Sequence, residues 1–259
     1  MRLPTDSRND QAEGLRQMFA HAQVTFVPVV ANPFVAFAGV LLERLCSAFV
    51  ARGASVLVVD AADSARAAGE MALVELTQCV EPLAPGVAYL AARGLPIRFV
   101  DARGSTQGFL RALADASPRS TVVLVHAGAP DLCRLFPAGP AGTEAARAIL
   151  FADDRPSSVT HAYAAMKLLV QRAGLVVFDL MLGAAPHSPR AERIAARLAG
   201  CADDFLGVVL RDWARIDPAE GALEPPGADL ARIVADRLAG GAARIRPPAA
   251  AAAREAVTP

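Results

Sequence analysis

The segment after residues 24–30 holds the residue types and spacing from which chemistry could be expected. An apolar strand that runs through a loop into a helix can bind phosphate, because N–H groups at the helix N-terminus point at the anion. Such a loop needs glycines for close approach and a lysine to meet the phosphate charge. The only lysine of this chain is Lys167, far downstream, and the loop reads Asn32-Pro33-Phe34-Val35-Ala36-Phe37-Ala38-Gly39.

The side chains of this loop predict a site that no longer receives phosphate. Pro33 lacks an N–H donor. Phe34, Val35 and Phe37 stand where small residues would let the backbone approach a ligand closely. We expect these three bulky side chains to fill the pocket instead.

The composition bounds the class of protein. A length of 259 residues allows one large or two small domains, and a hydrophobic content of 54% is ample for a buried core. Lys+Arg and Asp+Glu balance at 26 each, so no net positive charge attracts nucleic acid, and we expect no nucleic-acid partner.

The cysteines and histidines show no pattern of a reactive or metal-binding site. The four cysteines form no Cys-x-x-Cys pair and the four histidines show no ligand spacing, which predicts reduced thiols, no metal site and a cytoplasmic protein. No run reaches the ~20 apolar residues that span a membrane.

Elements alternate along the chain in a pattern typical of a parallel sheet. Short apolar runs predict strands at 24–30, 55–60, 97–100, 121–126, 148–152, 175–180 and 207–210. Helices are predicted between them at 36–52, 64–79, 106–116, 157–172 and 188–200. This order predicts an α/β fold, with a doubly wound, mostly parallel sheet flanked by helices. Asp60 and His126 end two of these strands, and Asp60 either serves a site there or caps the loop that follows.

Two further helices are predicted at the ends of this core. Residues 9–21 predict a short helix, with Asp10 and Glu13 spaced as a capping box. A helix of this length is marginal alone, so it must dock on its own domain or on a partner. A last helix at 229–238 is predicted to pack on the sheet, with a membrane-surface helix as the alternative. The predicted organisation is a tail with a partner-binding helix at 1–22, an α/β domain at 23–240 and a disordered Ala/Pro-rich tail at 241–259.

Two segments carry a specific family resemblance. The first reads Asp10-Gln11-Ala12-Glu13-Gly14-Leu15-Arg16; it precedes the first predicted strand and resembles the D-Q-A-x-x-L-R motif of FlhG proteins. The second begins Arg155-Pro156-Ser157-Ser158 and ends at Lys167; it resembles the P-T-S-x-x-D-A-Y-x-x-x-K stretch of the same proteins. The chain is therefore similar to FlhG, a regulator of flagellar number and placement in the MinD/ParA superfamily. The resemblance implies a MinD/ParA-like, SIMIBI-type P-loop fold.

The resemblance also implies a partner. In FlhG proteins the N-terminal motif binds the signal-recognition-type GTPase FlhF and stimulates its GTP hydrolysis. Carried over to this chain, it makes partner-binding residues of Asp10, Gln11, Ala12, Leu15 and Arg16. It further implies a cytoplasmic protein with peripheral contact at the inner membrane or cell pole, and contact with flagellar basal-body components.

The same resemblance marks where this sequence departs from an ATPase. Family spacing puts Pro33 at the lysine that crosses the dimer interface, Ala38 at the phosphate lysine and Gly39 at the magnesium-binding threonine. Asp60 survives from the first switch strand. In the Walker B-like strand, a histidine replaces the metal-shell aspartate and is a poor ligand for so hard a cation. The altered positions beyond the loop are His126, His161 in place of a family aspartate, and Phe178-Asp179 where a base-reading asparagine belongs.

These losses together predict a pseudo-ATPase. We expect no catalytic residue, no bound ATP or magnesium and no nucleotide-dependent dimer; ATP and Mg²⁺ would be the cofactors if the family's ATP hydrolysis survived. Two alternatives stay open: a divergent but active MinD-like ATPase cycling on the membrane, and an accessory scaffold of another polar secretion or exopolysaccharide system. The degenerate nucleotide site is assigned to Asn32, Pro33, Phe34, Phe37, Ala38, Gly39, Asp60 and His126.

Overall fold

The computed structural model describes residues 24–73, 75–102, 106–137, 146–221, 224–240 and 244–245. Their centre is one sheet with the strand order β3-β4-β2-β5-β1-β6-β7-β8, in which β9 also pairs with β1. Neighbouring strands are parallel, except that β3 is antiparallel to β4 and β9 to β1. The strands are β1 (Val24–Val30), β2 (Val56–Asp60), β3 (Glu81–Ala84), β4 (Val87–Ala91), β5 (Val122–Ala127), β6 (Ala148–Asp153), β7 (Val177–Gly183), β8 (Val209–Ile216) and β9 (Arg244–Ile245).

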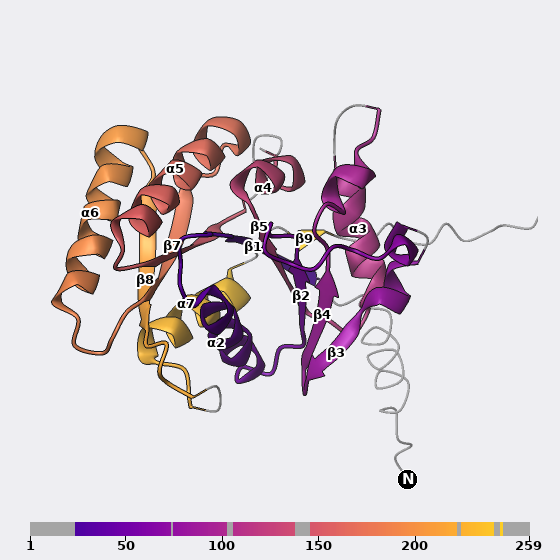
Figure 1. Cartoon of the computed structure of the whole chain (residues 1–259), viewed down its shortest axis with the longest axis horizontal. Helices are drawn as coiled ribbons and strands as arrows, with labels where there is room; N and C mark the ends of the chain where they lie inside the picture. Colours follow the sequence, from indigo (N-terminus) through magenta and orange to yellow (C-terminus); the bar gives the residue numbers. More distant parts are fainter. Residues whose placement is uncertain are drawn as a thin grey trace, which may run out of the picture.

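Helices cover both faces of this sheet (Figure 1). Each face buries its own apolar cluster, and side chains of a central strand alternate between the two: Phe26 faces one cluster and Val27 the other. This alternation is why the strands read as continuous apolar runs. The first face is covered by α3 (Gln107–Ala116), α4 (Ala129–Leu135), α5 (Pro156–Ala173) and α6 (Pro189–Leu206), and the second by α2 (Ala38–Val50) and α7 (Ala228–Ala239).

The strand order places β1 where the direction of the chain across the sheet reverses. β5 lies on one side of β1 and β6 on the other. Loops that leave neighbouring strands in opposite directions open a crevice at the carboxyl edge of the sheet, where ligands of open α/β sheets bind. The segments that meet at this crevice are residues 31–37 and 153–158.

The predicted α/β class, with a doubly wound and mostly parallel sheet, is confirmed. The predicted strand at 97–100 is wrong, because this segment is mainly the 3-10 turn η3 (Pro96–Phe99). Proline fixes φ and lacks the N–H that a sheet ladder requires. The predicted helix at 64–79 is also wrong. It is replaced by two short 3-10 turns, η1 (Glu70–Leu73) and η2 (Leu76–Cys79).

Several elements differ from the predicted set in extent or are new. The hairpin of β3 and β4 has no predicted counterpart; its turn holds Gly86 at φ +77°, a conformation that suits glycine. Helix α4 is also new and is only seven residues long. The strand predicted at 207–210 begins at Val209 and runs on to Ile216.

The predicted C-terminal helix packs on the sheet. Leu230, Ile233 and Val234 of α7 are buried in the cluster that α7 shares with α2. No helix in the described part of the chain is long and apolar enough to cross a membrane. Of the predicted C-terminal tail, Arg244–Ile245 form β9, and the predicted N-terminal helix lies outside the described residues.

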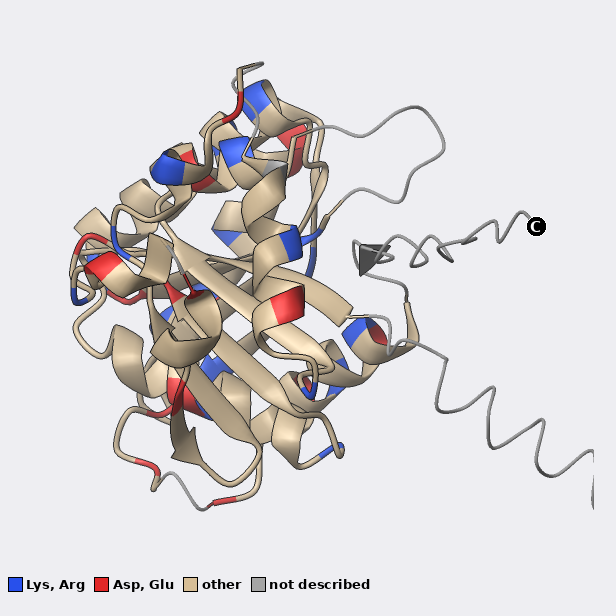
Figure 2. Ribbon diagram, turned by 90° about the vertical axis from the view of Figure 1, so that its right-hand side faces the viewer, with Lys and Arg blue, Asp and Glu red and all other residues tan. Residues whose placement is uncertain are grey.

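Charged residues of both signs are interspersed over the described part of the chain (Figure 2). One network of them is buried. Asp179 of β7 is fully buried and accepts hydrogen bonds from Arg237 Nε (3.0 Å) and Nη2 (2.5 Å), and Arg147 Nε lies 3.1 Å away. Arg147 also binds Asp236 (2.6 Å), which binds Arg211 (2.9 Å). Burial lowers the pKa of Arg237 to about 10, against the attraction of Asp179, so the guanidinium remains charged at neutral pH.

Replacing Asp179 tests how much this network contributes to the fold. Asp179→Ala should lower the free energy of unfolding by roughly 3–5 kcal/mol, because it leaves the buried Arg237 without its bonded carboxylate. Asp229→Ala is the matched control, since it removes an exposed bond to Arg232 (2.9 Å) and should cost less than about 1 kcal/mol. Urea denaturation followed by circular dichroism measures both. Equal losses in the two variants would contradict this account of the core.

Candidate functional site

The loop after β1 is anchored by the buried side chain of Asn32. Its Nδ2 donates to the carbonyl oxygens of Phe151 (2.8 Å) and Ser158 (2.9 Å), which belong to β6 and α5. Its Oδ1 accepts the N–H of Phe34 (3.1 Å), which turns the chain back on itself. Asn32 therefore ties the loop to the neighbouring strand and helix.

A carboxylate closes the far end of the same loop. Asp153, the last residue of β6, accepts the N–H of Ala36 at 3.0 Å, where the loop enters α2. Arg155 donates to the same carboxylate from its N–H (3.1 Å), Nε (3.0 Å) and Nη2 (2.8 Å). Its Nη2 also donates to the carbonyl oxygen of Phe34. A loop N–H that a phosphate would need is thus bonded to the protein's own carboxylate.

The charges explain why this closure is stable. Burial by itself raises the pKa of Asp153, but the hydrogen bonds from Arg155 and from the N–H groups of Ala36 and Arg155 outweigh it. The net pKa of Asp153 lies below its usual value, so the side chain is an anion at neutral pH. It accepts charge-assisted hydrogen bonds, which are stronger than neutral ones.

The predicted filling of the pocket by three apolar side chains is wrong for two of them. Val35 is buried, but Phe34 and Phe37 are 46% and 57% exposed. The Phe34 ring lies edge-on to the His161 ring, with centroids 5.6 Å apart. The hydrogen bonds of Asn32 and Asp153 fix the backbone direction of this loop, and that direction points both phenyl rings outward.

A small cavity remains beside the loop. Its volume is about 270 Å³, and it lies between Phe37, Asp153 and Pro218. Ligand pockets usually measure about 300–1,000 Å³, so this space is small for a nucleotide. The segment beyond Pro218 is held against α2 by the buried Arg44, which donates to the carbonyl oxygens of Gly221 (3.0 Å), Glu224 (2.7 Å) and Pro225 (3.2 Å).

Asp60 and His126 meet at the same edge of the sheet. They are register partners on β2 and β5, and Asp60 Oδ1 lies 2.9 Å from His126 Nδ1. Asp60 also accepts the N–H of Ala62 (3.3 Å) and the hydroxyl of Tyr89 (3.3 Å). Asp60 therefore caps the loop that follows β2, which is one of its two predicted roles. His126 Nε2 is buried without a hydrogen-bond partner among the described residues, and its ring lies 5.9 Å from that of Phe151.

The structure brings together some of the predicted site residues and separates others. Ala38 and Gly39 open α2 directly after the closed loop, and Pro33 is exposed at its turn. Asp179, at the position where the family has its base-reading asparagine, lies inside β7 and pairs with Arg237. The partner-binding residues Asp10, Gln11, Ala12, Leu15 and Arg16 lie outside the described residues.

Asp153 and Arg155 have no place among the predicted site residues, although both have central roles. The sequence signal that could have identified them is an Asp-Asp-Arg run directly after a predicted apolar strand. Strand ends of this kind meet at the carboxyl edge of a parallel sheet. The run could have been noticed, but its partners in residues 34–36 depend on the pairing of β1 with β6.

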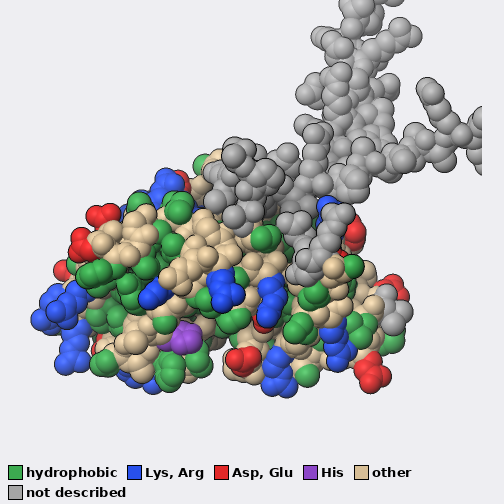
Figure 3. Space-filling view, turned by 90° about the horizontal axis from the view of Figure 1, so that it is seen from above, with side chains coloured by type: hydrophobic (Ala, Val, Ile, Leu, Met, Phe, Trp, Pro, Cys, Tyr) green, Lys and Arg blue, Asp and Glu red, His purple; other side chains and the backbone are tan. Residues whose placement is uncertain are grey.

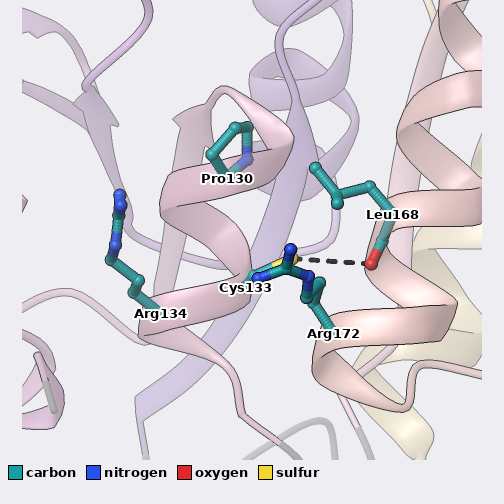
Figure 4. Close-up of a pocket in the computed structure, with 5 residues that line it drawn as sticks. All are labelled: Pro130, Cys133, Arg134, Leu168 and Arg172. Atoms are coloured by element: carbon teal, nitrogen blue, oxygen red, sulfur yellow. Dashed lines mark hydrogen bonds between the residues drawn. The ribbon is translucent and has the colours of Figure 1, made fainter. Parts of the chain in front are cut away.

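A second cavity, between α4 and α5, offers no reactive group. It measures about 430 Å³ and is lined by Cys133, Arg172 and their neighbours (Figure 4). The Cys133 thiol donates to the carbonyl oxygen of Leu168 (3.8 Å), and in Figure 4 Arg134 points away from it. Burial raises the pKa of this thiol against the opposing effect of Arg172 and Arg134. The protonated thiol is a poor nucleophile.

Comparison with known proteins identifies the fold. No protein-family model matches the sequence, and no curated protein matches it significantly. The MinD cell division protein of Aquifex aeolicus is 12% identical with a TM-score of 0.53, over 86% of this chain and 100% of that one. The McdA(D38A)–ATP complex from Cyanothece is 13% identical with a TM-score of 0.55, over 87% and 100%. Cobyrinic acid a,c-diamide synthase from Mycobacterium smegmatis with bound ADP and magnesium is 13% identical with a TM-score of 0.56, over 86% and 100%. At these identities the likeness establishes the fold alone, which is the MinD/ParA-like fold.

The residues of this chain do not fit the nucleotides named in two of those structures, or the magnesium named in one of them. The Ala36 N–H is bonded to Asp153, and the only lysine is exposed on α5. Asp60 and His126 are bonded to each other. Across the described residues no group of three or more His, Cys, Asp or Glu side chains could hold a metal ion. A phosphate that used the Ala36 N–H would have to displace Asp153 from it.

Asp153→Asn tests the closure of the loop. At pH 7 the change should lower the free energy of unfolding by about 1.5–3 kcal/mol, the range for hydrogen bonds to charged groups. The folded-state pKa lies below the ordinary value of 3.8, so this contribution is present above about pH 3.8 and is lost as the pH falls through the folded-state pKa. Urea denaturation at a series of pH values should show the two proteins converging only in strong acid.

Asp131→Asn is the matched control, because it removes an exposed pair with Arg134 (2.9 Å) in α4. Its effect should stay below about 1 kcal/mol at every pH. A pH-independent gap between wild type and Asp153→Asn would show that the charge of Asp153 does not hold the loop.

Proposed function

We propose that this chain is an FlhG-like regulator of flagellar number, placement and assembly that works as a pseudo-ATPase. It docks on the FlhF GTPase through its N-terminal segment Asp10–Arg16 and stimulates GTP hydrolysis. The observation that supports the loss of nucleotide chemistry best is the 3.0 Å bond from the Ala36 N–H to the Asp153 carboxylate. A loop in this state serves as a rigid part of a scaffold.

Three independent features support the same interpretation. The Ala36 N–H is satisfied internally, so a phosphate that used this donor would have to break its bond to Asp153. No lysine stands near the loop to balance phosphate charge. His126 at the metal position is bonded to Asp60 rather than presented to a cation. The bonded Ala36 donor, the missing lysine and the histidine at the metal position together favour a scaffold over a slow enzyme.

The chemistry of the N-terminal segment supports the proposed partner. Gln11 and Arg16 have polar side chains long enough to reach into a composite site with the GTPase. An arginine fork matches phosphate geometry, and a glutamine orients an attacking water in GTPases. Ala12 and Leu15 provide the apolar docking contact. The FlhF-type GTPase is the proposed partner, and its own site carries out the hydrolysis.

Titration with Mg–ATP tests the pseudo-ATPase. Calorimetry of the full chain should give no binding heat, and light scattering should give the same mass with and without Mg–ATP. The physical reason is that Asp153 holds the donor and no lysine is available. Saturable binding that Asp60→Ala abolishes, or a nucleotide-dependent rise in mass, would instead support the divergent ATPase.

GTP turnover by FlhF tests the docking function. The full chain should accelerate FlhF GTP hydrolysis, and Gln11→Ala or Arg16→Ala should remove roughly tenfold or more of that stimulation. Arg8→Ala is the matched control, since it removes a nearby arginine outside the motif and should leave the rate unchanged. FlhF turnover that is the same with and without the wild-type chain would refute this function. Capture of another polar secretion or exopolysaccharide component would then support the accessory scaffold.

A further inference from the structure

A long groove separates α5 and α6 at the surface of the protein. Its volume is about 1190 Å³, much larger than the cavity beside the loop. Val159 of α5 and Ile194 of α6 provide half-buried apolar side chains, and Ala196 and Gly200 provide small residues. The groove shares only Asp154 with the cavity beside the loop, so it is a separate surface.

Three arginines follow one face of α6 along this groove. Arg190, Arg193 and Arg197 are spaced i, i+3 and i+7, so they cover about 10 Å of the helix. All three are exposed. Arg193 Nε donates to the carbonyl oxygen of Pro189 (3.1 Å), and within the described residues neither Arg190 nor Arg197 has an ion-pair partner. Basic side chains gather at the left-hand end of the surface in Figure 3, the side on which Figure 1 places α6.

This arrangement is unfavourable for the isolated helix. Arg190 stands in the first turn of α6, which begins at Pro189, where the helix dipole disfavours positive charge, and Arg193 follows directly after that turn. Arg193 and Arg197 are like charges at i, i+4, which repel each other. Helix stability therefore does not explain the row, whereas an anionic partner would relieve both effects.

The end of the groove opposite Arg190 carries a negative charge. Asp204 lines the groove there, about four turns from Arg190, or roughly 21 Å along the helix. Asp154 lies at the end near Arg190. Carboxylates at both ends disfavour a phosphate backbone, which carries negative charge along its whole length. The pattern suits a ligand with a row of acids over the arginines and a basic group near Asp204.

We propose that this groove docks an acidic amphipathic helix of a partner protein. Acidic side chains at i, i+3 or i+4, and i+7 of that helix would pair with Arg190, Arg193 and Arg197. Its apolar stripe would lie on Val159 and Ile194, as in other helix-in-groove complexes. Gly200 lets the partner backbone approach closely. This inference rests on α5 and α6 alone and is independent of the proposed GTPase docking.

A designed peptide tests the proposal on the full chain. The probe is a fluorescein-labelled 14-residue helix with glutamates on one edge and a leucine stripe, and its partner probe carries lysines in place of the glutamates. Fluorescence polarisation should show the glutamate peptide binding at least tenfold more tightly. The double change Arg193→Glu with Arg197→Glu should weaken binding of the glutamate peptide at least tenfold and should strengthen binding of the lysine peptide. Arg119→Glu, an exposed arginine in the loop before β5, is the matched control.

Gly200→Leu separates docking from folding. No atom lies within 4 Å of the position of a Cβ at Gly200, so the new side chain fits the isolated chain and projects into the groove. The variant should keep the thermal stability of the wild type, and its affinity for the glutamate peptide should fall at least tenfold.

Three results would overturn the proposal. One is equal binding of the acidic and basic peptides. Another is binding that neither the double charge reversal nor Gly200→Leu weakens. The third is tighter binding of a peptide of residues 1–22, or a concentration-dependent dimer lost in the charge-reversed variant, because the occupant would then be this chain itself.

Discussion

The arrangement of the central crevice depends on the carboxylate of Asp153. It joins β6 to the loop after β1 by accepting the Ala36 N–H, and it positions Arg155 to bind the carbonyl oxygen of Phe34. A crevice of this fold otherwise presents free N–H groups to an anion at the helix N-terminus. Here the anion is covalently part of the chain, so the Ala36 N–H is bonded at every concentration of ligand. The loop is consequently a fixed surface that displays Phe34 and Phe37.

The rest of the fold holds this closure in register. Asn32 bonds to β6 and α5 from the other end of the loop, and Arg44 holds the segment after β8 against α2. Beneath them, two apolar clusters bury both faces of the sheet. The charged network around Asp179 and Arg237 sits in the same core, where breaking a pair costs more than forming it contributes. Apolar packing thus stabilises the core, and the polar groups determine which single arrangement it adopts.

The parts that followed local patterns could be predicted, and the parts that depend on distant packing could not. The apolar strands and the loop without a lysine are visible in the sequence, because each is set by neighbouring residues. The partnership of Ala36 with Asp153 joins residues 117 positions apart, so no local spacing reveals it. The exposure of Phe34 and Phe37 was missed for a related reason: hydrophobicity predicts burial, but the Asn32 turn sets their direction. At η3, Pro96 prevents an apolar run from forming a strand, so the strand predicted there is wrong.

The claim on which this account depends is that Asp153 occupies the phosphate-facing donor of the loop. The most direct measurement is the ¹H–¹⁵N spectrum of the full chain, with attention to the Ala36 amide, recorded with and without millimolar Mg–ATP. The account predicts an Ala36 signal that is unchanged by Mg–ATP and that moves when Asp153 is replaced by asparagine. A saturable shift of the Ala36 signal with Mg–ATP in the wild-type protein would contradict it, because the donor would then be open to phosphate.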